Sequence, residues 1–277
     1  MVINDLVHAI SLSRSEGWNQ TDKDWRFLLM NPDNVCLAAE QDNKLVGTAA
    51  ATVHSSKLAW IGMVLVDKNL RGLGVGRNLM INLINNLKHI NSIKLDATPA
   101  GLPLYQKLGF IEEHHICRMV NPLNKGLMVL ESGYKPEIIE KNKLPDILKL
   151  DKKIFGSNRP SLLRSLFQNY PEKAFMINKD GKTNGYIFGR EGIRYDYIGP
   201  ASSPSKESVM SLITIALNSM AGKPVALDIL QDKQDVIRRL ELSGFEIQRS
   251  FVRMYLKNNN YPGEVNSQYL ISGPEFG

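Results

Sequence analysis

The same order of secondary-structure elements is predicted twice in this chain of 277 residues. Residues 35–66 contain three short apolar runs separated by turn residues, which predicts three strands; a helical pattern over residues 79–87, the strand SIKLDA, the helix GLPLYQKL and the segment GFIEEHHICRMV follow. The second half repeats this order with AFMIN, TNGYIFG, RYDYIGP, a helix near residues 207–220, PVALDIL, DVIRRLEL and GFEIQRSFVRMYL. Ordered anchors coincide at nearly one offset, namely Gly109-Phe110 with Gly244-Phe245, Arg118-Met119 with Arg253-Met254, and Gly47 with Gly185. The sequence therefore predicts an internal duplication.

Two domains of similar size are expected from this duplication, and each is long enough to build its own core. Turn residues gather between the two halves in NPLNKGLMVLESGYKP, residues 121–136. We therefore expect a first domain at residues 1–125 and a second domain at residues 126–277.

The composition is that of a water-soluble protein, and its charges are scattered. Thirty-four basic and 28 acidic side chains give a formal charge of +6 with no long basic run, so a small anionic ligand accounts for the charge and no nucleic-acid partner is expected. Cys36 and Cys117 stand in strand-like apolar contexts without metal-ligand spacing, which predicts buried thiols and no metal site. The N-terminal segment lacks the features of a signal peptide, and no apolar run reaches the ~20 residues that span a bilayer. We expect a cytoplasmic protein without a membrane partner.

The segment VLVDKNLRGLGVGRNLMINLI, residues 64–84, carries three glycines between an apolar strand and an amphipathic helix. Unpaired amides and the dipole at a helix N-terminus favour an anion, and glycines let phosphate oxygens approach the backbone. Gly72, Gly74 and Gly76 therefore predict a phosphate or pyrophosphate site. A Walker loop would need G-K-[ST], which is absent, and a dinucleotide fingerprint would need a glycine where Arg77 stands, although Asp96 follows 20 residues beyond Gly76. The pattern that fits is R-x-x-G-x-G, residues 71–76.

Two motifs together resemble the GNAT superfamily, the acyl-CoA-dependent N-acetyltransferases. The family's loop Q/R-x-x-G-x-G/A is matched at residues 71–76, and its Y-x-x-x-G-F segment is matched at residues 105–110. The resemblance covers most of residues 1–120 and implies a mixed α/β fold, in which each repeat is a mostly antiparallel twisted sheet flanked by helices. It also implies acetyl-CoA as cosubstrate, with the pantetheine arm along a splayed strand edge and the pyrophosphate on the glycine loop. The residues expected to bind it are Val64, Leu65, Val66, Arg71, Gly72, Leu73, Gly74, Val75, Gly76 and Arg77.

The chemistry that the resemblance implies is attack of a primary amine on the thioester in a ternary complex, since neither cysteine has a nucleophile context. Tyr105 would protonate the leaving thiolate, and a backbone amide near Leu65 or Val66 would stabilise the oxyanion. The base is open, because WIGMVLV lacks the carboxylate often found on this strand of the family. Asp96 is the leading candidate, although it could instead cap the following helix. Glu16, Asp22 and His54 are the other candidates.

The acceptor is expected to be a small-molecule amine, and the sequence identifies neither the amine nor the oligomeric state. Trp18 and Asn19, in a polar loop between two amphipathic helices, and Thr98, beside Asp96, are the candidate substrate-binding residues.

The second half has lost the predicted coenzyme site. Leu240 stands opposite Tyr105, and ASSPSKESVM, residues 201–210, replaces the glycine loop. Pro200 and Pro204 also remove backbone amides. The arrangement resembles bacterial proteins that join a conventional GNAT domain to a divergent one, and the tail YLISGPEFG is similar to the ending of that group. Acids of this half could face a cationic amine, namely Asp196, Asp228 and Asp232. Two other functions remain open, a non-catalytic acyl-CoA-binding module and a nucleotide-dependent oxidoreductase.

Overall fold

The first half of the chain forms the predicted strands and helices. The computed structural model describes residues 1–42, 44–126 and 133–277. Thr21 begins the second helix as its N-cap, since its hydroxyl accepts from the Asp24 amide and the Asp24 carboxylate accepts from the Thr21 amide. The elements are α1 (Leu6–Ser15), α2 (Asp22–Met30), β1 (Val35–Gln41), β2 (Lys44–Ser55), β3 (Leu58–Val66), α3 (Val75–Asn86), β4 (Ser92–Ala97), α4 (Leu102–Lys107) and β5 (Ile111–Asn121).

The second half repeats this order, which confirms the predicted duplication. Gly109 and Gly244 both have a φ of 89°, and each precedes a phenylalanine whose amide donates to the carbonyl five residues earlier, from Phe110 to Tyr105 and from Phe245 to Leu240. The elements are β6 (Glu137–Ile138), α5 (Leu144–Phe155), α6 (Pro160–Asn169), β7 (Phe175–Lys179), β8 (Lys182–Arg190), β9 (Asp196–Ser202), α7 (Lys206–Ser219), β10 (Val225–Leu230), α8 (Gln234–Leu242), β11 (Glu246–Lys257) and β12 (Gln268–Leu270).

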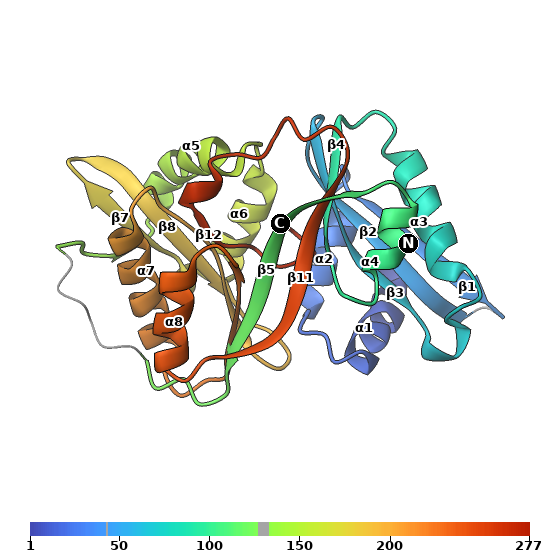
Figure 1. Ribbon diagram of the computed structural model, residues 1–277, viewed down its shortest axis with the longest axis horizontal. Coiled ribbons are helices and arrows are strands. Elements are labelled where there is room, and N and C mark those ends of the chain that lie inside the picture. Colours follow the sequence, from blue (N-terminus) through green and yellow to red (C-terminus); the bar gives the residue numbers. More distant parts are fainter. Residues whose placement is uncertain (43, 127–132) are drawn as a thin grey trace.

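In the described part of the chain, a mixed sheet of twelve strands runs through both halves, in the order β1-β2-β3-β4-β11-β5-β10-β12-β9-β8-β7-β6. The two halves exchange their long strands: β11 pairs with β4 of the first half, and β5 pairs with β10 of the second half. β5 and β11 also pair with each other, antiparallel, and lie side by side at the centre of the molecule (Figure 1). The predicted mixed α/β repeats are therefore confirmed, but their sheets are joined through the exchanged strands.

The exchange brings two equivalent ion pairs together. On β5, Arg118 lies opposite Asp228 of β10 and binds its two carboxylate oxygens at 2.8 and 2.7 Å. On β11, Arg253 lies opposite Asp96 of β4 and binds its oxygens at 2.9 and 3.1 Å. Each half therefore supplies the arginine that neutralises a buried aspartate of the other half.

Three large apolar clusters form the interior. One lies between α3, α4 and the sheet and includes Met254 of the exchanged strand β11, and one lies around α7 and α8 and includes Cys117 and Met119 of the exchanged strand β5. The third is shared, because α1 and α2 contribute Leu6, Ala9 and Trp25 while α6 and β8 contribute Leu163 and Phe188. The expected boundary after residue 125 stays a prediction, and residues 127–132 of the linker lie outside the described part. Asn124 already packs on the second half, since its amide donates to the carbonyls of Leu217 and Met220.

Candidate functional site

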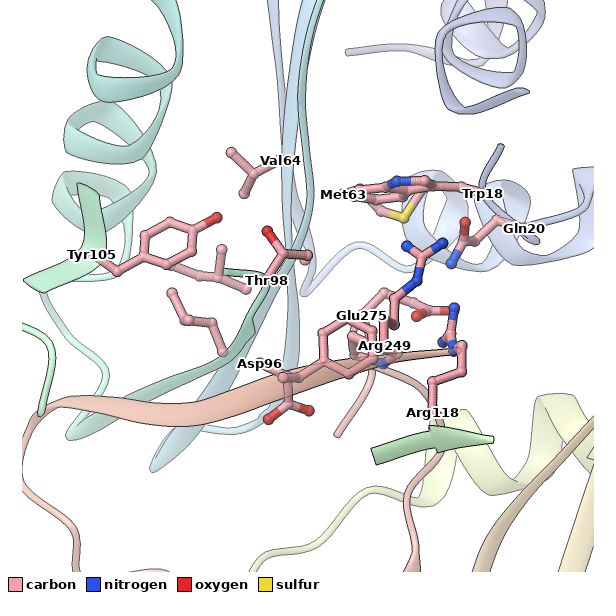
Figure 2. A pocket seen from close by; sticks show the side chains of 15 residues that line it. Trp18, Gln20, Met63, Val64, Asp96, Thr98, Tyr105, Arg118, Arg249 and Glu275 are labelled. Carbon is pink, nitrogen blue, oxygen red and sulfur yellow. The ribbon is translucent and has the colours of Figure 1, made fainter. Parts of the chain in front are cut away.

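A cavity opens where the two halves meet (Figure 2). Its walls come from β3, the end of β4, α4, the loop between α1 and α2, the exchanged strands β5 and β11, and the C-terminal segment after β12. The lining residues are Trp18, Gln20, Ile61, Gly62, Met63, Val64, Leu95, Asp96, Thr98, Tyr105, Arg118, Arg249, Phe251, Pro274 and Glu275.

Strands β3 and β4 part beside this cavity. They are parallel and paired from Leu58–Ser92 to Ile61–Leu95, and beyond that point β3 pairs with β2 but not with β4 in the described structure. Met63 has a φ of 53° where the β2–β3 register shifts, so a bulge marks the place where the strands separate. Parted parallel strands leave one edge of β3 able to bind an extended ligand by backbone hydrogen bonds.

The glycine loop follows β3 and forms an exposed turn at the start of α3. Gly72 and Gly74 have φ values of 81° and 84°, and a Cβ on either would meet no described atom within 4 Å. Gly74 is the N-cap of α3, whose first hydrogen bond from inside the helix is from the Asn78 amide to the Gly74 carbonyl. The amides of residues 75–77 therefore precede the first such bond and lie at the positive end of the helix dipole.

Arg71 holds this loop in place. Its Nε donates to the Val66 carbonyl at 3.2 Å, and its Nη2 lies 2.6 Å from Glu16 Oε1. Lys68 reaches the same carboxylate at 3.8 Å. The loop is therefore tied both to the end of β3 and to the loop that follows α1.

Tyr105 projects from α4 into the cavity, on the same side as Val64 and Thr98 (Figure 2). Burial raises the pKa of its phenol to about 12, so the hydroxyl is protonated at neutral pH. Gly101 leaves room for the ring, because a Cβ there would stand 2.8 Å from Tyr105 Cε2. A neutral phenol next to the parted strands is suited to donate a proton to a developing anion.

Both halves match profiles of one acetyltransferase family. The profile described as the acetyltransferase (GNAT) family matches residues 3–110, and the profile described as the acetyltransferase (GNAT) domain matches residues 147–270. The chain belongs to the GNAT superfamily. Its two GNAT domains are arranged in tandem.

The chain is similar to proteins named as acyltransferases and to solved structures of acetyltransferases. The GNAT chain is 28% identical over 193 residues to the uncharacterized N-acetyltransferase YitH of Bacillus subtilis, a match that covers 68% of this chain and 66% of that protein. It is 24% identical to the holothin acyltransferase of a Pseudoalteromonas species, over 91% of this chain and 84% of that protein. Among solved structures, a candidate acetyltransferase from Pyrococcus horikoshii superposes with a TM-score of 0.82 at 21% identity, covering 100% of this chain and 94% of that one. A tandem GNAT protein from the clavulanic acid biosynthesis pathway gives 0.64 at 13% identity, covering 92% and 96% of the two chains.

The carboxylate of Asp96, the leading candidate for the base, is fully buried and holds Arg253 with both oxygens. Burial raises the pKa of Asp96, and the Arg253 guanidinium opposes that rise. In Figure 2 the carboxylate points away from Tyr105 and Thr98. This geometry favours a structural role for Asp96 across the exchanged strands, while its catalytic role stays an untested prediction.

The other candidate bases lie outside the cavity wall. Glu16 binds Arg71, and Asp22 binds Arg26 on the surface of α2. His54 is buried, and its Nε2 lies 2.8 Å from the Phe276 carbonyl. Burial is the main reason why the pKa of His54 falls to about 3, so its ring is neutral but is enclosed by the C-terminal segment.

The predicted acceptor residues separate into two groups. Trp18 and Thr98 line the cavity, and Thr98 also accepts a hydrogen bond from the Gly101 amide. Asn19 does not line it. Its side chain donates to the Tyr195 carbonyl and accepts from the amides of Arg194 and Tyr195. This geometry favours a role for Asn19 in docking the second half, while its substrate-binding role stays a prediction.

Four polar residues of the cavity were missed by the sequence reading, namely Gln20, Arg118, Arg249 and Glu275. Glu275 lies in the segment after β12, and a Cβ on Gly62 of β3 would stand 2.5 Å from the Glu275 Cα. Its Oε1 accepts from Arg190 Nη2 at 2.6 Å, while its buried Oε2 has no hydrogen-bond partner in the described structure. In the sequence, Gly62 was the one sign that another segment packs against β3, because a glycine leaves the space that the segment of Glu275 fills.

The second GNAT domain has no glycine cradle at the corresponding helix. The hydroxyl of Ser205 caps α7 by accepting from the Ser208 amide, so one of the helix's first amides is already bonded. Leu240, opposite Tyr105 in the repeat, is fully buried. Two of the acids predicted to face the amine are instead paired with basic side chains, since Asp228 binds Arg118 and Asp196 binds Lys173.

Neither a metal-binding cluster nor a membrane-crossing helix is found among residues 1–42, 44–126 and 133–277. The described His, Cys, Asp and Glu side chains form no group that could hold a metal ion. The longest described helices are too short or too polar to span a bilayer.

Proposed function

We propose that this protein transfers an acetyl group from acetyl-CoA to the nitrogen of a small-molecule amine, within a ternary complex at the cavity described above. The observation that carries the proposal is that three features lie next to one another: the open glycine cradle, the edge of β3 where it parts from β4, and the neutral phenol of Tyr105. The relatives named as an N-acetyltransferase and as a holothin acyltransferase support acyl transfer as the reaction class.

The residues fit coenzyme A. The amides of residues 71–77 and the glycines at 72 and 74 suit a pyrophosphate, and the edge of Val64, Leu65 and Val66 suits an amide-containing arm. Acetyl-CoA supplies the acetyl group as an activated thioester. The glycine cradle fixes its position.

In the proposed step a C–N bond forms as the C–S bond breaks. Tyr105 gives its phenolic proton to the leaving sulfur, and a backbone amide of Leu65 or Val66 stabilises the negative charge on the carbonyl oxygen. The cysteines do not compete as nucleophiles, because burial raises the pKa of the Cys36 thiol to about 11 and also raises that of Cys117.

The proton lost by the amine requires a second group, and the cavity wall has two carboxylates, Asp96 and Glu275. Both oxygens of Asp96 are taken by Arg253, whereas one oxygen of Glu275 has no partner in the described structure. We therefore assign proton acceptance to Glu275, which the second domain delivers beside Gly62 of β3. Gly62 lies on β3, the strand that has no carboxylate of its own.

The test is acetyl transfer by the full chain to a broad amine panel, with release of free coenzyme A as the readout. Removing a positioned general acid costs about 10²–10⁴-fold in kcat, so Tyr105→Phe is expected to lose that much while coenzyme A binding changes little. Tyr255→Phe, on β11 and outside the cavity, is the matched control. Equal turnover by Tyr105→Phe and the native protein would refute the acid assignment, and tight coenzyme A binding without acetylation of any amine would favour the binding-module alternative.

A further inference from the structure

Four charged side chains line the cavity, and three of them already have a partner of opposite charge. Asp96 binds Arg253, Glu275 binds Arg190, and Arg118 binds Asp228. The side chain of the fourth, Arg249, forms neither an ion pair nor a hydrogen bond within the described part of the chain. Its guanidinium lies near Trp18 and Gln20, across the cavity from Tyr105 (Figure 2).

A bulge in β11 aims Arg249 into the cavity. Ile247 pairs with Met119, but Arg249 pairs with Arg118, so β11 uses one extra residue between these positions. An extra residue changes which face of the sheet the following side chains occupy. The bulge therefore places Arg249 on the face of Arg118, directly opposite that residue, instead of on the face of Ile247.

This position is unfavourable without a ligand. Like charges directly opposite each other on neighbouring strands repel, and a partly buried charge without a partner loses hydration with no compensation. Arg249 is half-buried, and burial, followed by the charge of Arg118, lowers its pKa. The charge of the nearby Asp228 opposes this fall in part, but its carboxylate forms no hydrogen bond with Arg249, because its oxygens bind Arg118 and the Tyr197 hydroxyl.

We propose that Arg249 binds a carboxylate carried by the acceptor, so that the acceptor is an amino acid-type molecule with both an amine and a carboxylate. The inference rests on the proposed acetyl transfer and names the substrate class of that site. Arginine binds carboxylates with two parallel hydrogen bonds, which fixes the orientation of the acceptor as well as its affinity. With its carboxylate on Arg249, the acceptor extends its amine across the cavity toward Met63 and Tyr105.

The experiment compares the twenty standard amino acids with their primary amides as acceptors for acetyl-CoA. A hydrogen bond to a charged group predicts that kcat/KM for the preferred amino acid exceeds that for its amide by about 10- to 100-fold, mostly through KM. In Arg249→Gln this ratio is expected to fall toward 1, and Arg249→Lys should restore part of it. Arg238→Gln, an exposed arginine of α8 whose partner is Asp235, is the matched control and should keep the ratio.

Stability gives a second readout that does not need a substrate. Because Arg249 has no partner in the described structure and faces Arg118, Arg249→Gln is expected to melt at the same temperature as the native protein or higher. A lower melting temperature would overturn the idea that the guanidinium is free for a ligand.

The remaining outcomes separate the two proposals. Equal rates with amino acids and amides, or equal losses for both in Arg249→Gln, overturn the carboxylate site while acetyl transfer stands. A preference for succinyl-CoA over acetyl-CoA that disappears in Arg249→Gln assigns the carboxylate to the acyl donor and overturns the acceptor assignment. Absence of transfer to every amine in both series refutes the proposed function itself.

Discussion

The Asp96–Arg253 pair allows the exchanged strands to be tested by a double-mutant cycle. The side chain of Asp96 is 0% exposed and that of Arg253 is 5% exposed, and they are joined by two hydrogen bonds. Removing one partner of such a pair leaves a buried charge unpaired, which costs about 3–5 kcal/mol. Asp96→Leu and Arg253→Met are therefore each expected to lose this much, a large share of the ~5–15 kcal/mol that holds a typical domain together.

The double variant Asp96→Leu/Arg253→Met should be much less destabilised than the sum of the single changes. Burial raises the pKa of Asp96 more than Arg253 lowers it, so the pair does not fully recover the hydration that it lost. Replacement of a buried pair by apolar side chains is then close to neutral. The equivalent cycle on Arg118 and Asp228 gives a matched comparison in the other half.

Urea unfolding followed by circular dichroism measures these free energies, with the slope m checked for constancy. Additive losses in the double variant, or single variants as stable as the native protein, would refute the reasoning. Activity separates the two roles of Asp96: if it is structural, kcat of folded Asp96→Asn falls less than about tenfold, whereas loss of a general base costs about 10²–10⁴-fold.

Three further predictions concern the cradle, the base and acid stability. Gly74→Val places a branched side chain at a φ of 84°, so KM for acetyl-CoA should rise about tenfold or more, while Gly222→Val, at a φ of 81° in the second half, should carry similar strain and leave KM unchanged. Glu275→Gln should lower kcat by about 10²–10⁴-fold while Glu264→Gln, an exposed partner of Lys153, does not; an unchanged kcat would exclude Glu275 as the proton acceptor. His54 has its pKa lowered from 6.5 to about 3, so the unfolded chain binds a proton that the folded chain does not. The free energy of unfolding should therefore decrease as the pH is lowered from 6.5 to 3, by up to about 1.4 kcal/mol per pH unit. A shallower acid-unfolding curve for His54→Asn would support this, whereas a curve identical to that of the native protein would contradict it.

Local patterns in the sequence predicted the elements and the coenzyme loop. The alternation of apolar residues, the turn residues between the strands and the helical spacing after residue 75 depend on near neighbours, and they gave β1 to β4 and α3 correctly. The same holds for the positive φ values of Gly72 and Gly74 and for the turn after Tyr105.

Local sequence patterns could not predict contacts between residues that are far apart in the sequence. In the sequence Asn19 is an ordinary polar loop residue. In the structure its side-chain amide donates a hydrogen bond to the carbonyl of Tyr195, 176 positions away. In the sequence Glu275 is a polar residue near the C-terminus. In the structure its segment folds back and packs against Gly62. The tertiary structure therefore places Glu275 of the second domain beside β3, a strand that carries no carboxylate of its own.

The sequence by itself determined the duplicated plan, the single glycine cradle and the position of the phenol, because turns, caps and periodicity are encoded within a few residues. Only the tertiary structure decided that β5 and β11 exchange and that Arg253 forms an ion pair with Asp96, 157 positions away. It also decided that the Arg249 side chain faces the cavity without a partner in the described structure. The physical reason is strand register: one extra residue in β11 sets which side chain enters the cavity, and that register is fixed by pairing between the two halves.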